Sequence, residues 1–119
     1  MILNLTQHGA TAEQAEAGVV EPQSKGVVQS LLTFNTLPTV TEITERAKKL
    51  AILARAEGAT AVMIGGAPFL MGALQDTLME FDITPLFAFS VRESVETENA
   101  DGSVSKTAVF RHLGFVKVF

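Results

Sequence analysis

The chain has 119 residues, of which 47% are hydrophobic and 18% charged, and its formal net charge is −4 at pH 7. These values are typical of one soluble globular domain, and the negative charge argues against binding of long nucleic acid. Because the chain has no cysteine, disulfides, thiolate metal ligands and cysteine nucleophiles are excluded. No apolar run approaches the roughly 20 residues that cross a bilayer, and no secretion leader is recognisable. We therefore expect a single cytoplasmic domain over residues 1–119 with no membrane partner.

A short apolar run opens the chain and predicts a parallel strand over residues 1–5. A polar run at residues 6–8 follows it. Thr11 and Gln14 then have the spacing of a capping box, which predicts a helix that ends at Gly18. Between residues 19 and 34 the pattern is weaker and indicates a further helix.

The centre of the chain predicts a strand, a glycine turn and a helix. A second capping signal at Thr39 predicts a long helix up to Gly58, and this helix leads to a buried strand over residues 61–64. We expect the two strands joined by this helical crossover to be parallel. Such a crossover connection is right-handed in nearly all cases. After the strand, Gly65 and Gly66 precede Pro68, which suits the first position of another helix.

The last third of the chain predicts a strand and a hairpin. Residues 86–89 are apolar, and the polar run at residues 90–94 predicts a turn after them. Alternating residues around Asp101-Gly102 then predict a hairpin in which Thr97 faces Lys106 and Val95 faces Ala108. We expect an α/β fold, namely a three-layer Rossmann-like and mostly parallel sheet with a C-terminal β-hairpin.

The last strand, expected over residues 115–119, carries apolar side chains on both faces. A small domain has difficulty in covering both faces alone, which favours a homodimer. The alternative is a core strand that the helices cover. The residues concerned are Phe115, Val116, Val118 and Phe119.

The polar groups that follow the predicted strands form the candidate binding site. In an open parallel sheet, ligands bind beyond the carboxyl ends of the strands, so these groups are expected to meet at one edge. The candidate ligand-binding residues are Thr6, Gln7, His8, Gly65, Gly66, Ser90, Arg92 and Ser94.

Each candidate has an alternative interpretation. Gly65-Gly66 either makes only a tight turn or cradles a phosphate at the helix start, and it matches neither a GxGxxG fingerprint nor a P-loop. His8 is either a hydrogen-bonded turn residue or a catalytic general acid or base. Arg92 either pairs with a neighbouring glutamate or clamps a phosphate. Arg111 and His112 either return to the same edge or lie on an exposed end.

Several chemistries are disfavoured by the residues present. The two histidines lie far apart in the chain without a nearby carboxylate cluster, so we expect no metal site and no cofactor. No GxSxG nucleophile motif occurs. The remaining possibility is binding of a small nucleotide-type anion, with or without metal-independent phosphodiester cleavage.

Four segments carry a resemblance to known proteins. Residues 4–8, 65–71, 89–94 and 109–116 together resemble a small uncharacterised family of bacterial and phage proteins over nearly the whole chain. More distantly, the first strand with its polar end, the strand and Gly-x-Pro turn and the hairpin resemble stand-alone CRISPR-associated Rossmann-fold (CARF) and ring-nuclease-like proteins. That resemblance implies a dimer that senses, sequesters or cleaves cyclic oligoadenylates in antiviral defence.

Two hypotheses from different classes follow. The first is a nucleotide-ligand protein, acting either as a binder or as a ring nuclease. The second is a non-enzymatic structural or protein-interaction domain of phage or bacterial origin, whose polar turns are only turns. A ligand that binds only the native state raises its stability, so a thermal-shift screen against nucleotides separates the two.

Overall fold

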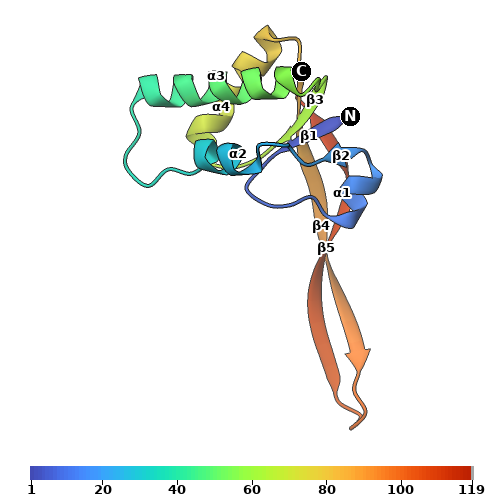
Figure 1. The fold of residues 1–119 in the computed structure, drawn as a ribbon. Helices are drawn as coiled ribbons and strands as arrows, with labels where there is room; N and C mark the ends of the chain where they lie inside the picture. The colour runs from blue at the N-terminus through green and yellow to red at the C-terminus, as the bar shows by residue number, and fades with distance from the viewer. Residues whose placement is uncertain (119) are drawn as a thin grey trace.

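The computed structural model describes residues 1–118 and shows helices packed on a sheet from which a long hairpin projects (Figure 1). Its longest dimension is 58 Å, against 32 and 26 Å for the other two, because the hairpin extends away from the other elements. In chain order the elements are β1 (Ile2–Leu5), α1 (Ala12–Glu16), β2 (Val19–Val20), α2 (Lys25–Leu32), α3 (Val40–Ala56), β3 (Ala61–Ile64), α4 (Pro68–Glu80), β4 (Thr84–Glu98) and β5 (Val104–Lys117).

The five strands lie in the order β2-β1-β3-β4-β5. β1 is parallel to both β2 and β3, and β3 is parallel to β4. The predicted parallel arrangement of the strands near residues 1–5, 61–64 and 86–89 is therefore confirmed. The last pair, β4 and β5, is antiparallel.

The predicted three-layer Rossmann-like fold with a mostly parallel sheet is wrong. The sheet is mixed and curls into a half-barrel, and its antiparallel pair joins thirteen residue pairs, against two, four and three in the parallel pairs. Figure 1 shows α2, α3 and α4 on one side of the strands and α1 on the other. Because α1 has only five residues and none of them is buried, it does not form a covering layer.

The difference from the prediction arises after Phe89. The polar run at residues 90–94, predicted to be a turn, continues β4 because it pairs residue by residue with β5. A register shift between Phe89 and Ser90 leaves Leu113 as an extra residue on β5. A strand that is exposed on both faces accepts polar side chains at every position, so the polar run does not end it.

The hairpin turns at Asp101 and Gly102, as predicted, but its loop has three residues rather than two. The Asn99 N–H donates to the Ser103 carbonyl at 2.8 Å, and the Gly102 N–H donates to the Asn99 carbonyl at 3.0 Å. Gly102 has a φ of 84°, which glycine adopts without steric cost. A turn closed by a left-handed glycine is the usual form of a three-residue hairpin loop.

The longer loop changes the register of the hairpin by one residue. Thr97 pairs with Ser105 rather than with the predicted Lys106, and Val95 pairs with Thr107 rather than with Ala108. A shift of one residue exchanges the two faces of a strand, so these predicted pairs are wrong in partner and in face.

Three predicted helix starts are confirmed. Thr11 and Gln14 form a reciprocal capping box at α1, the Thr39 hydroxyl accepts from the Glu42 N–H at α3, and Pro68 begins α4. The two-residue strand β2 was not predicted, because so short a segment has no periodicity to detect. No helix within residues 1–118 is long and apolar enough to cross a membrane.

The core lies between α2, α3 and α4 and the side of the sheet that they cover. Alternate residues of β1 and β3, such as Leu3, Leu5, Val62 and Ile64, point into it. The helices supply the other members, including Val28, Leu32, Ala47, Leu50, Ala51, Ala54, Leu70, Met71, Leu74 and Leu78.

Residues 115–117 of the strand predicted over residues 115–119 are the end of β5 rather than a separate element. Phe115 is partly buried, whereas Val116 and Val118 are exposed. Phe119, the fourth residue of the predicted dimer surface, lies outside the described residues.

Candidate functional site

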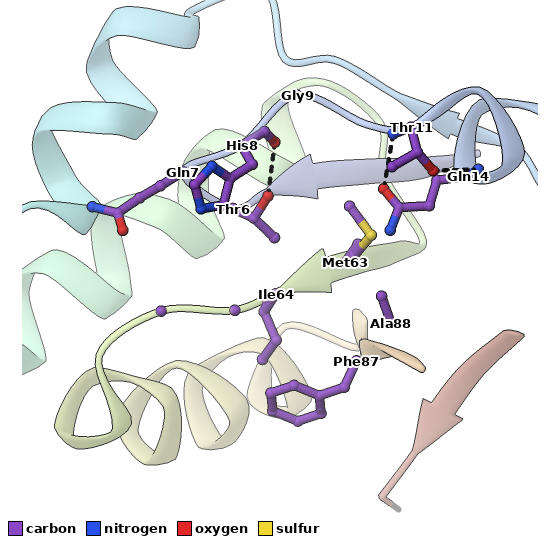
Figure 2. A pocket seen from close by; sticks show the side chains of 12 residues that line it. Thr6, Gln7, His8, Gly9, Thr11, Gln14, Met63, Ile64, Phe87 and Ala88 are labelled. Carbon is purple, nitrogen blue, oxygen red and sulfur yellow. Dashed lines mark hydrogen bonds between the residues drawn. The ribbon is translucent and has the colours of Figure 1, made fainter. Parts of the chain in front are cut away.

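An open pocket with a volume of about 410 Å³ lies at the carboxyl ends of β1 and β3 and beside the first half of β4 (Figure 2). The loop after β1 lies on one side of it, and the end of β3 lies on the other. The pocket is lined by Thr6, Gln7, His8, Gly9, Thr11, Gln14, Met63, Ile64, Gly65, Gly66, Phe87 and Ala88.

The loop that forms the first side is held by the buried side chain of Asn4, which is only 1% exposed. The Asn4 side-chain oxygen Oδ1 accepts from the Thr6 N–H at 3.0 Å and from the Thr6 hydroxyl at 2.7 Å, and the side-chain NH₂ of Asn4 donates to the backbone carbonyl of His8 at 2.8 Å. The Thr6 hydroxyl also lies 2.9 Å from the same His8 carbonyl. Asn4 therefore determines the shape of this side of the pocket from inside the strand.

A carboxylate from beyond β2 completes this network. Glu21 accepts from the Asn4 amide at 3.1 and 3.2 Å and from the Ala10 N–H at 2.7 Å. Burial raises the pKa of Glu21, but the Ala10 N–H, the Asn4 amide and the Lys25 ammonium together hold that pKa below its ordinary value. Glu21 is thus an anchor for both ends of the loop between β1 and α1.

The start of α1 forms one end of the pocket. The Gln14 N–H donates to the Thr11 hydroxyl at 3.2 Å, and the Thr11 N–H donates to the Gln14 amide oxygen at 3.1 Å. Figure 2 shows this pair apart from Gln7 and His8, at the other end of the pocket. Because both residues are fixed by the cap, they present a preformed polar wall.

The opposite side is the turn from β3 into α4. Gly66 has a φ of 149°, a conformation that favours glycine, and Ala67 is the N-cap of α4 without a side-chain hydrogen bond. Among residues 1–118, the N–H groups of Gly66 and Ala67 donate to no protein acceptor. Since α4 has thirteen residues, the partial positive charge at its N-terminus adds to these free donors.

Apolar side chains form the floor of the pocket. Ile64 belongs to the core cluster and Phe87 packs against it, whereas Met63 and Ala88 belong to the opposite face of the sheet. The pocket therefore combines an apolar floor with polar groups at its rim, as small-molecule sites generally do.

The structure brings five of the eight predicted binding residues together. Thr6, Gln7, His8, Gly65 and Gly66 all line the pocket. The other three, Ser90, Arg92 and Ser94, lie beyond the register shift on one face of the projecting hairpin. No arginine or lysine is among the lining residues.

Arg111 and His112, whose position the sequence left open, lie on the returning strand β5. Arg111 is exposed and pairs with Glu93 across the hairpin at 3.4 Å. His112 packs edge-on against Phe115, with ring centroids 4.9 Å apart, and neither of its ring nitrogens has a hydrogen-bond partner in the described part of the chain.

His8 is the one lining side chain suited to proton transfer near neutral pH. It is exposed, and its own carbonyl is fixed by Asn4 and Thr6, but no side chain within residues 1–118 hydrogen-bonds its ring. No group of three or more His, Cys, Asp or Glu side chains in the same part of the chain is placed to hold a metal ion.

Sequence reasoning missed the residues that organise the pocket. Asn4 and Glu21 were not candidates, although an amide inside an otherwise apolar strand is a detectable signal of a buried polar network. Phe87 and Ala88 were also not predicted to line the site, because apolar residues within a strand are common and carry no signal of binding.

Comparison with known proteins identifies a family. A sequence model of the family described as "Uncharacterized protein MJ1673 family" matches residues 1–116, so the chain belongs to this family. No curated protein and no solved structure matches the chain.

Proposed function

We propose that this member of the Uncharacterized protein MJ1673 family binds a small anionic ligand of the nucleotide type in the pocket at the carboxyl ends of β1 and β3. The observation that carries the proposal is the pairing of an apolar floor with free backbone donors at the start of α4. Such donors, together with the helix dipole, attract a phosphate group. A planar base is suited to the apolar floor, in which Ile64 and Phe87 lie on the same face of the sheet.

The size and charge of the pocket restrict the ligand. A volume of about 410 Å³ is at the small end of ligand sites, which favours one nucleotide unit in each pocket. Because no arginine or lysine lines the pocket, the ligand would be bound mainly by neutral hydrogen-bond donors, and one phosphate suits them better than a triphosphate. The resemblance to CARF proteins adds cyclic oligoadenylates to the ligands that deserve a test.

Binding without turnover is the form of the proposal that we favour. Hydrolysis of a phosphodiester requires groups that activate the attacking oxygen and stabilise the leaving one. His8 alone has this capacity among the lining residues, and no side chain between residues 1 and 118 hydrogen-bonds its ring and would orient it.

A thermal-shift series tests the proposal with adenosine, inorganic phosphate, AMP, ATP, and linear and cyclic oligoadenylates as probes. A ligand at about 100 times its Kd adds about 2.7 kcal/mol to native stability, which raises the Tm of a domain of this size by several degrees. We expect AMP or an adenylate oligomer to raise the Tm more than adenosine or phosphate alone. An equal response to all of them, or none, would refute nucleotide binding.

Two matched glycine variants locate the site. A Cβ at Gly65 would lie 3.6 Å from Thr6 Cγ2, so Gly65→Ala is accommodated by the fold but narrows the pocket. Gly72→Ala is the control, because it lies within α4 with no atom within 4 Å of the added Cβ. Ligand affinity is expected to fall by at least about tenfold in Gly65→Ala and to stay unchanged in Gly72→Ala.

Chromatography of cyclic oligoadenylate after incubation with excess protein separates a binder from a nuclease. An intact ring is expected from both the wild type and His8→Ala. Linear products that disappear with His8→Ala would instead assign catalysis to His8, with an expected loss of roughly 10² to 10⁴ in rate.

A protein-interaction role is the second candidate, and the projecting hairpin is the observation that favours it. This role does not require the pocket, so both functions can reside in one chain.

A further inference from the structure

Residues 90–112 of β4 and β5 form a two-stranded arm that projects from the domain. Every residue from Arg92 to Arg111 is exposed, and Figure 1 shows no other element beside this part of the chain. A lone two-stranded ribbon is marginally stable in water, because each strand has one neighbour and neither face is covered. The arm therefore has the properties of an element that is completed by a partner.

The cross-strand register determines what each face of the arm presents. Residues that pair directly across the strands share a face. One face carries, from base to tip, the pairs Ser90–His112, Arg92–Phe110, Ser94–Ala108, Glu96–Lys106 and Glu98–Val104. We call it the Phe110 face; Phe110 itself is 74% exposed.

The charge of the arm limits the kind of partner. The arm contains three cationic and four acidic side chains, namely Arg92, Lys106 and Arg111 against Glu93, Glu96, Glu98 and Asp101. A net charge of −1 is unsuited to nucleic acid or an anionic membrane. It does not oppose association with a surface of the same composition.

The Phe110 face is complementary to itself. Arg92, near the base, makes no ion pair within residues 1–118, whereas the acid Glu96 lies toward the tip, 3.6 Å from Lys106. The small residues Ser94 and Ala108 lie midway between the two charged pairs. A twofold axis through the middle pair therefore brings the base half of one face onto the tip half of the other.

We propose that the Phe110 face binds the same face of a second copy of this chain, with the two arms antiparallel and the twofold axis at the Ser94–Ala108 pair. Each β4 then crosses the partner's β4 in the opposite direction. Arg92 faces the partner's Glu96, and Phe110 faces the partner's Lys106.

In that arrangement the cationic side chain of Arg92 and the aromatic ring of Phe110 each face a side chain that attracts them. Arg92, which makes no ion pair within residues 1–118, acquires a carboxylate, and the exposed ring of Phe110 acquires an ammonium over its face. The small side chains at the axis allow close approach of two ribbons that would otherwise lie about 10 Å apart. Since each arm offers only one narrow face, the dimer belongs to the small and reversible class of interfaces.

A cysteine pair tests the geometry, because the chain itself contains no cysteine. Ser94→Cys places a thiol at the proposed axis, whereas Ser105→Cys places the same change on the opposite face of the same arm, where Ser105 pairs with Thr97. A bismaleimide that spans about 10 Å is expected to link Ser94→Cys into a dimer and to leave Ser105→Cys monomeric. Equal linking of the two variants, or none, would overturn the proposal.

Charge reversal tests the pairing independently of cross-linking. Arg92→Glu faces the partner's Glu96, so the dissociation constant measured by sedimentation is expected to rise by at least about tenfold. Combining Arg92→Glu with Glu96→Arg restores opposite charges and is expected to recover most of that loss. A double variant no tighter than the single one would contradict the antiparallel register.

The oligomeric state of the wild type gives the simplest refutation. A mass that stays at 12.7 kDa up to high protein concentration would mean that the arm does not bind a second copy. None of these measurements involves a nucleotide, so their failure would leave the proposed ligand pocket unaffected.

Discussion

The buried amide of Asn4 donates to both carboxylate oxygens of Glu21, at 3.1 and 3.2 Å, although the two residues lie seventeen positions apart. This contact joins the interior of β1 to the segment after β2. The same amide also holds the His8 carbonyl. The shape of the pocket thus depends on the hydrogen bonds between Asn4 and Glu21, although neither side chain lines the pocket.

Replacing Asn4 by leucine is expected to destabilise the domain by at least about 2 kcal/mol, because it leaves the His8 carbonyl, the Thr6 N–H and Glu21 without this partner. Chemical denaturation measures the change. Asn35→Leu is the control, since Asn35 is exposed and makes no side-chain hydrogen bond within the described chain. A difference of less than about 0.5 kcal/mol between the two variants would contradict the assigned role of Asn4.

The second prediction concerns pH. The pKa of Glu21 is held below its ordinary value of 4.5 in the folded chain, so its contribution to stability is fully present above that pH. The contribution is lost as the pH falls through the lowered, folded-state pKa.

Melting curves from neutral pH down to about pH 3 are expected to show wild type more stable than Glu21→Gln at neutral pH, with the two converging in acid. Glu45→Gln, on the exposed part of α3, is expected to follow wild type throughout. A constant difference between wild type and Glu21→Gln would rule out this linkage.

The third prediction compares the two glycines after β3. Gly66 has a φ of 149°, so Gly66→Ala is expected to lose about 1–2 kcal/mol of stability through backbone strain. Gly65 has no positive φ, and its added Cβ meets Thr6 at an ordinary contact distance, so Gly65→Ala is expected to stay within about 0.5 kcal/mol of wild type. Urea denaturation distinguishes them, and equal stabilities would show that the turn relaxes without cost.

The fourth prediction concerns the cap of α3. Thr39→Ala removes the acceptor for the Glu42 N–H, at 3.1 Å, and is expected to cost about 1 kcal/mol. Thr41→Ala, two positions into the same helix, removes a hydroxyl that caps nothing and is expected to be neutral or slightly stabilising. If both variants behave alike, the cap contributes nothing measurable.

Local features of the fold could be predicted from the sequence because they depend on near neighbours. The cap at Thr11, the helix start at Pro68 and the hairpin turn at Gly102 each follow from the geometry of a few consecutive residues. The parallel order of β1, β3 and the start of β4 follows from apolar strands separated by helical crossovers.

Long-range contacts determine where β4 ends and what surrounds the pocket. The polar run at residues 90–94 suits a turn and an exposed strand equally well, and its pairing with β5 makes it a strand. That pairing places Arg92 on the arm instead of beside Gly66, and a contact across seventeen positions makes Asn4 and Glu21 the support of the pocket. Such outcomes depend on which distant segments meet, and the energy of those contacts is absent from any local pattern of residues.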